Sequence, residues 1–150
     1  MRQSPPDPEK LNPRQLIDSL SRLASNKKAL DEVLIRRNAS TLFFALFNYW
    51  AAKSYAKGRR ARGHCPYEDC FPYSEFLQEM LGAGLEYAIY PLYLYRVLAD
   101  HYTLNPTKVI LTSRPFKNRQ AEVGLSHNTV DNLLRLAYDV LEYLEKLNRK

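Results

Sequence analysis

The sequence predicts an all-α fold, an antiparallel bundle of four to five helices in a single domain. Only five of the 150 residues are glycine, so long stretches can form helix without meeting a breaker. Near the C-terminus, apolar residues recur every three or four positions, which places them on one face of a helix. With no internal repeat and no sign of a second domain, we assign residues 12–150 to one bundle and residues 1–11 to a flexible proline-rich tail.

The first helix is expected to start at Asn12 and Pro13, with asparagine as the N-cap and proline at the first helical position. Its apolar stripe begins at Leu16, and we expect the stripe to continue as far as Leu34. Around residues 36–38 the chain is expected to turn or bend.

The second helix, expected over residues 39–57, is the predicted core helix. Its large apolar side chains fall at i, i+1, i+4, i+5 and i+8, which makes one broad face. These residues are Leu42, Phe43, Leu46, Phe47 and Trp50. The stretch "KGRRARGHCPYEDCFPY" follows, and its glycines and prolines predict a loop.

A short third helix is expected to begin near Ser74 and to stop at Gly82 or Gly84. The fourth, "LEYAIYPLYLYRVLADHY", must hold Pro91 in its first turns or kink there, because proline donates no backbone hydrogen bond. Tyrosines crowd this segment, and tyrosine enrichment favours a subunit interface.

A basic loop, "TKVILTSRPFKNRQ", comes next, and residues 109–111 within it are expected to form a short extended piece. The last helix has the clearest pattern. From Asn128 onward its apolar residues follow the helical repeat to the end of the chain: Val130, Leu133, Leu134, Ala137, Val140, Leu141, Leu144 and Leu147.

The charge balance narrows the classes of partner. The net charge of +6 and the isoelectric point near 9.3 favour partners that carry phosphate. The most apolar run is 14 residues, shorter than the roughly 20 that span a bilayer. The polar start of the chain lacks a secretory signal, and two cysteines are too few for a disulfide scaffold. We therefore expect a cytoplasmic protein with no membrane contact.

Four segments, in this order, resemble the HEPN superfamily, the helical domains found in prokaryotic nucleotidyltransferase-linked toxins and related proteins. "RRNASTLFFALFNYWAAKSY" looks like the long second helix of the family, and "YSEFLQEMLGAG" is similar to its short connecting helix. "LYRVLADHY" resembles the R-x4-6-H stretch, and "LLRLAYDVLEYLEKL" is similar to the closing helix. The resemblance covers most of the chain and implies a homodimer, with the fourth helices near each other.

In active members of that family, the arginine and histidine of R-x4-6-H cleave RNA without a metal, in a cleft between two protomers. The resemblance assigns these roles to Arg96 and His101. The histidine would move a proton, and the arginine would stabilise charge on the phosphorane. A nucleotidyltransferase-type protein is the partner that the resemblance implies.

Helix geometry favours a second interpretation of the same residues. On an unbroken helix, Arg96 and His101 would point about 140° apart. Arg96 would then share a face with Asp100 at i+4, as a surface ion pair, and His101 would be a helix-terminal residue favoured by the dipole. Both interpretations stay open on the sequence alone.

Basic residues predict an RNA-binding surface in two loops, with aromatic residues between them for base stacking. These are Arg59, Arg60, Arg62, Lys108, Arg114, Lys117 and Arg119. His64, Cys65 and Cys70 lack the spacing and number of a zinc site, so we expect no metal and no cofactor. The leading functional hypothesis is an RNA-binding protein with metal-independent endoribonuclease activity. The alternatives are a non-catalytic helical module that binds a protein partner, such as a nucleotidyltransferase, and a bundle that serves oligomer assembly.

Overall fold

The structure of the chain is a computed structural model, which describes residues 13–25, 32–56, 73–101 and 109–147. The expected flexible tail, residues 1–11, lies outside the described residues. Within them the protein is mostly helical, as predicted, with one small hairpin added. The elements in order are α1 (Pro13–Ser25), α2 (Glu32–Ala56), α3 (Tyr73–Gly82), α4 (Glu86–His101), β1 (Val109–Ser113), η3 (Arg114–Phe116), β2 (Arg119–Val123) and α5 (His127–Leu147).

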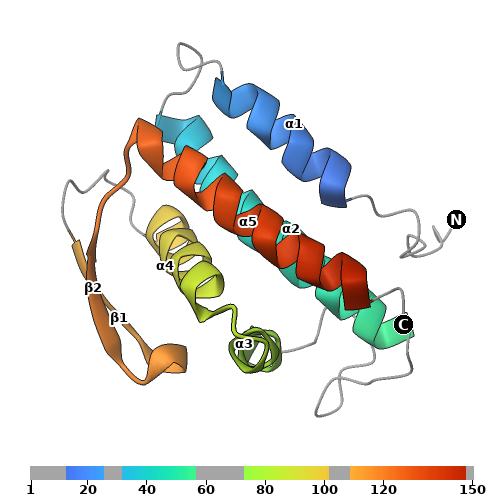
Figure 1. Cartoon of the computed structure of the whole chain (residues 1–150). Helices are drawn as coiled ribbons and strands as arrows, with labels where there is room; N and C mark the ends of the chain where they lie inside the picture. Colours follow the sequence, from blue (N-terminus) through green and yellow to red (C-terminus); the bar gives the residue numbers. More distant parts are fainter. Residues whose placement is uncertain (1–12, 26–31, 57–72, 102–108, 148–150) are drawn as a thin grey trace, which may run out of the picture.

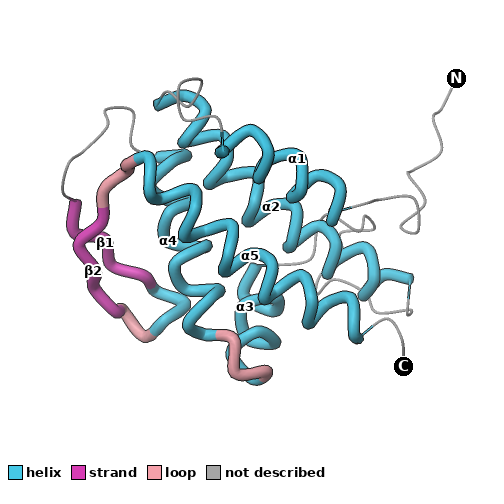
Figure 2. Tube along the Cα trace, turned by 45° about the horizontal axis from the view of Figure 1, so that its top comes forward, coloured by secondary structure: helices cyan, strands magenta, loops and turns pink. Residues whose placement is uncertain are grey.

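The helices pack around α2. Figure 1 shows α1, α2 and α5 running side by side, with α4 next to α2 and α5, and α3 below α4. The hairpin lies on the outer side of α4, away from α1, as both views show (Figure 2). None of the described helices is both long and apolar enough to cross a membrane.

The predicted core helix is confirmed, because α2 buries the broad apolar face that its sequence pattern indicates. Phe43 is fully buried and meets Phe76 of α3 edge to face, with ring centroids 6.0 Å apart. Trp50 is 2% exposed, and its indole N–H donates to a carboxylate oxygen of Glu79. Each fully buried side chain of this size contributes about 1.5–3 kcal/mol, so this face anchors the bundle.

The turn predicted around residues 36–38 is wrong, and so is the continuation of the first stripe to Leu34. α1 ends at Ser25, and α2 is unbroken from Glu32 to Ala56. Within the unbroken helix, the amide nitrogen of Asn38 donates to the carbonyl of Leu34 at 2.8 Å. Leu34 thus belongs to α2 and not to the first helix.

The predicted stop of the third helix is confirmed. α3 ends at Gly82, and Gly84 has φ = +80°, a left-handed conformation that glycine adopts without strain. The Leu85 N–H donates to the carbonyl of Met80 at 2.9 Å, which closes the helix end and redirects the chain into α4.

The basic loop predicted over residues 107–120 is wrong in part, because residues 109–113 and 119–123 pair as the two strands of a β-hairpin. The extended piece at residues 109–111 is confirmed as part of β1, which pairs antiparallel with β2 from Val109↔Val123 to Ser113↔Arg119. Lys117 and Asn118, with φ of 57° and 58°, form the left-handed turn between the strands. Phe116 anchors the hairpin on α4, with its ring centroid 4.8 Å from that of Tyr90.

Candidate functional site

Arg96 lies on the face of α4 that packs against α2. Arg96 is 8% exposed, and its guanidinium carbon lies 5.3 Å from the ring centroid of Phe43 and 5.6 Å from that of Phe44. Tyr93, one helical turn earlier, adds a third ring at 5.2 Å. The positive charge therefore sits among aromatic rings, an arrangement stabilised by the ring quadrupoles.

The i+4 ion pair predicted for Arg96 is present, with Nη1 3.7 Å from Oδ2 of Asp100. It is not the surface pair that was expected, since the arginine side chain is only 10% exposed and the carboxylate side chain 30%. His101 is the last residue of α4 and is exposed. Because the helix is unbroken between them, Arg96 and His101 point about 140° apart. Within one chain, the structure does not bring them together.

The predicted RNA-binding residues divide into two groups. Arg59, Arg60, Arg62 and Lys108 lie outside the described residues, and so do His64, Cys65 and Cys70. The others are all exposed on the hairpin: Arg114, Lys117 and Arg119.

Arg119 is held in place on the hairpin. Its guanidinium carbon lies 4.3 Å from the ring centroid of Tyr90, and its Nη1 is 3.9 Å from Oε1 of Glu86. Three exposed cations thus lie on the hairpin, and one of them contacts an aromatic ring of α4.

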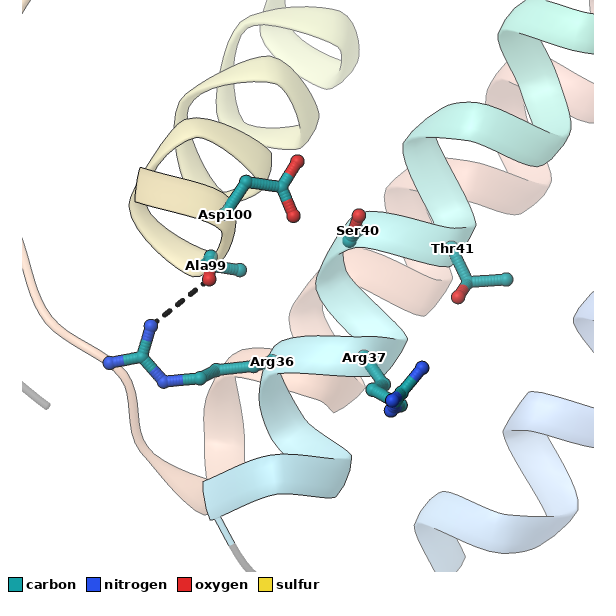
Figure 3. A pocket seen from close by; sticks show the side chains of 6 residues that line it. All are labelled: Arg36, Arg37, Ser40, Thr41, Ala99 and Asp100. Atoms are coloured by element: carbon teal, nitrogen blue, oxygen red, sulfur yellow. Dashed lines mark hydrogen bonds between the residues drawn. The ribbon is translucent and has the colours of Figure 1, made fainter. Parts of the chain in front are cut away.

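A pocket of about 370 Å³ opens where α2 and the C-terminal end of α4 meet (Figure 3). We call it the α2–α4 pocket. The ion pair partner of Arg96 lines it, and the other lining residues come mostly from α2. The full set is Arg36, Arg37, Ser40, Thr41, Ala99 and Asp100.

The α2 side of the pocket presents hydrogen-bond donors. Arg36 and Ser40 are four residues apart, as are Arg37 and Thr41, so each pair lies on one ridge of the helix. Arg36 reaches across to α4, where its Nη1 donates to the carbonyl oxygen of Ala99 at 3.0 Å. That carbonyl lies in the last turn of α4, where helix carbonyls carry partial negative charge.

Sequence reasoning did not find this pocket, because it placed a turn at residues 36–38. The signal that was present is the spacing R-R-x-x-S-T over residues 36–41, which aligns two guanidinium groups with two hydroxyls if the segment is helical. Its other wall comes from α4, and nothing in the local sequence indicates that these segments meet.

The pocket is suited to bind an anion with several oxygens. Guanidinium groups make forked, charge-assisted hydrogen bonds to phosphate, and hydroxyl groups add further donors.

Among the described residues, no cluster of three or more His, Cys, Asp or Glu side chains could hold a metal ion. No protein-family model, curated protein or solved structure matches the chain.

Proposed function

We propose that this chain is an HEPN-like RNA-binding protein that holds an RNA phosphate in the α2–α4 pocket. The observation that carries the proposal is the pocket lining, in which Arg36, Arg37 and two hydroxyl residues border a volume of about 370 Å³. Arg37 is exposed and can reach a phosphate, whereas Arg36 already donates to the α4 carbonyl. Arg37 is therefore the main phosphate ligand.

The charge of the whole chain supports the same partner. A net charge of +6 attracts a polyanion from a distance, and the exposed cations of the hairpin extend the positive surface beyond the pocket. The base stacking expected at the hairpin is not supported, because Phe116 and Tyr90 beside these cations are buried, at 5% and 6% exposure.

Cleavage of that RNA without a metal needs a base for the 2′-hydroxyl and a cation for the phosphate. His101, exposed at the end of α4, is the base that we assign. It takes the proton as the 2′-oxygen bonds to phosphorus and the bond from phosphorus to the 5′-oxygen breaks, and that oxygen takes a proton from water. We assign the cation to Arg37, because Arg96 lies against three rings.

The likeness to HEPN proteins also leads us to propose a homodimer and a nucleotidyltransferase-type partner. In a dimer, a second copy would add its own Arg37 and His101 to a shared cleft. Light scattering checks the first point, because a dimer has twice the 17.5 kDa mass of the chain. A mass of one chain at working concentration would contradict it.

The test of RNA binding is retention of a mixed single-stranded RNA at moderate salt, with EDTA present. Arg37→Ala should weaken retention about tenfold or more, since a charge-assisted hydrogen bond contributes about 1.5–3 kcal/mol. The matched control is Arg135→Ala, which removes an exposed arginine from α5, away from the pocket residues. Equal effects of the two variants would mean that the pocket is not the site.

The same samples test the remaining hypotheses. Release of RNA fragments in EDTA, lost in His101→Ala but kept in Arg135→Ala, supports cleavage by the assigned base. Retention without fragments leaves a binding protein. If the native protein retains no RNA, the proposal is wrong, and the alternative of a module for a protein partner takes its place.

A further inference from the structure

The two walls of the α2–α4 pocket differ in chemical character. The α2 wall presents cations and hydroxyls, whereas the α4 wall presents the Asp100 carboxylate and the last helical turn. Figure 3 shows the Asp100 carboxylate turned from α4 toward α2, at the level of Ser40. A ligand that satisfies both walls must carry an anion at one end and N–H donors at the other.

The carboxylate of Asp100 is positioned to accept such donors. Its Oδ2 lies 3.7 Å from Arg96, which is longer than the roughly 2.7–3.2 Å of an N–H···O hydrogen bond. A carboxylate has about four lone-pair sites, so this contact leaves it able to accept two parallel hydrogen bonds. Arg96, fixed among its rings, holds the carboxylate at the wall, so we treat it as a positioning residue.

Among the four RNA bases, guanine matches this wall best. Its Watson–Crick edge presents two adjacent N–H donors, N1–H and N2–H, that fit the two oxygens of one carboxylate. Adenine and cytosine offer only an amino group on that edge, next to ring acceptors that would face the carboxylate. Uracil offers a single N–H between two carbonyl oxygens, which the carboxylate repels.

We propose that the α2–α4 pocket binds a guanosine phosphate, with the guanine edge on Asp100 and the phosphate on Arg37. The pocket volume of about 370 Å³ falls within the range of about 300–1,000 Å³ that is typical of small-ligand sites. The inference rests on the proposed function, because it names the nucleotide that the same pocket selects from RNA. A free guanosine nucleotide offers the same groups.

The first experiment needs no variant. Calorimetry at fixed salt compares the affinities of the native protein for GMP, IMP and AMP. It also compares the affinities for a uridine oligonucleotide that carries one guanosine and for the same oligonucleotide without the guanosine. IMP lacks the 2-amino group, so it should bind about tenfold more weakly than GMP, and AMP more weakly still. If the oligonucleotide with guanosine binds more tightly than the one without it, RNA supplies the guanosine that the pocket binds. If only GMP shows the preference, the ligand is the free nucleotide.

The second experiment assigns the preference to Asp100. Asp100→Asn replaces one carboxylate oxygen by a donor, so the preference for GMP over AMP should fall to about onefold while phosphate binding through Arg37 remains. Glu142→Gln, an exposed acid on α5 away from the pocket residues, is the matched control and should keep the preference. Retention of the preference in a folded Asp100→Asn protein would overturn the assignment.

Failure of this inference and failure of the proposed function give different results. If all nucleotides and both oligonucleotides bind equally well, and Arg37→Ala still weakens binding, the guanine preference is wrong and the phosphate site remains. If Arg37→Ala does not weaken binding at all, both the guanine preference and the proposed function are wrong.

Discussion

Arg96 carries a full charge at a buried position, and its neighbours explain how the fold tolerates this charge. The rings of Phe43, Phe44 and Tyr93 surround the guanidinium within 5.6 Å of their centroids. Asp100 supplies the countercharge from the next turn of α4. A charge that is buried without such partners would be strongly destabilising, so this side chain joins α4 to α2 as much as any apolar residue does.

Replacement of this side chain should therefore reduce stability. Arg96→Ala removes the packing of the stem and the cation–π contacts, and we expect a loss of about 2–3 kcal/mol in the free energy of unfolding. Asp100, with a side chain 30% exposed, stays partly solvated, which keeps the loss below that of a fully buried pair. Urea denaturation measures the difference.

His101→Ala serves as the comparison, because the exposed last residue of a helix should contribute less than about 0.5 kcal/mol. If Arg96→Ala keeps its full stability and its RNA affinity but loses cleavage, the result would favour the catalytic interpretation of Arg96.

At this scale the sequence predicted relations within one helix and not those between helices. The pairing of Arg96 with Asp100 follows from their i, i+4 spacing, and it is confirmed. The depth of the pair does not follow, because Phe43 and Phe44 are contributed by a helix more than fifty positions earlier in the chain. Burial of a charge depends on such distant neighbours, and a local pattern contains no information about them.

The attachment of α1 combines a small apolar contact with a polar one. Ile17 and Ala24 are the buried residues of this helix. Arg14 donates to Glu145 of α5 at 2.7 Å, and the Tyr138 hydroxyl donates to Asp18 at 2.5 Å. Because little apolar surface holds α1, hydrogen bonds supply a larger share of its stability than they do for α2.

Tyr138 gives this attachment a pH dependence. Burial, and then the hydrogen bond to Asp18, raise the pKa of the Tyr138 hydroxyl above its ordinary value of 10.0. A raised folded-state pKa means that its contribution to stability is fully present below about pH 10 and is lost as the pH rises through the folded-state pKa. Tyr138→Phe should unfold more easily by about 0.5–1.5 kcal/mol at neutral pH.

Urea denaturation of both proteins from pH 7 to 11 measures the effect. The pKa of Tyr87 is also raised, chiefly by its hydrogen bond to Asp139, and burial raises that of Tyr95, so the native protein alone cannot isolate Tyr138. The difference between native protein and Tyr138→Phe should shrink above pH 10. A constant difference across that range would contradict the role given to this hydroxyl.

Whole elements were predictable where their pattern was long and periodic. α5 begins within one residue of its predicted start, because its apolar stripe runs over about five turns. β2 was missed, since "RQAEV" is short, mostly polar and carries few of the β-branched and aromatic residues typical of strands. It forms a strand because it pairs with β1, whose inward residue Leu111 packs with Phe116 in the core.

Over the whole molecule, the candidate site is a product of helix packing. The α2–α4 pocket joins residues 36–41 to residues 99 and 100, segments about sixty positions apart. The sequence predicted the net charge of +6 and hence an anionic partner, but not the position at which that partner is held. Charge composition is a sum over the chain, whereas a pocket depends on how two helices cross.

The salt dependence of RNA affinity separates the pocket from the diffuse charge around it. For single-stranded RNA, each phosphate neutralised by a cation contributes about −0.7 to the slope of log affinity against log salt concentration, because counterions are released. Arg37→Ala should therefore make the slope less steep by about 0.7, whereas Asp100→Asn, which removes no cation, should leave it unchanged. Filter binding from 50 to about 300 mM salt measures both slopes. Arg135→Ala controls for the loss of one charge, and if it changes the slope as much as Arg37→Ala does, RNA contacts the protein through its general positive charge and not through the α2–α4 pocket.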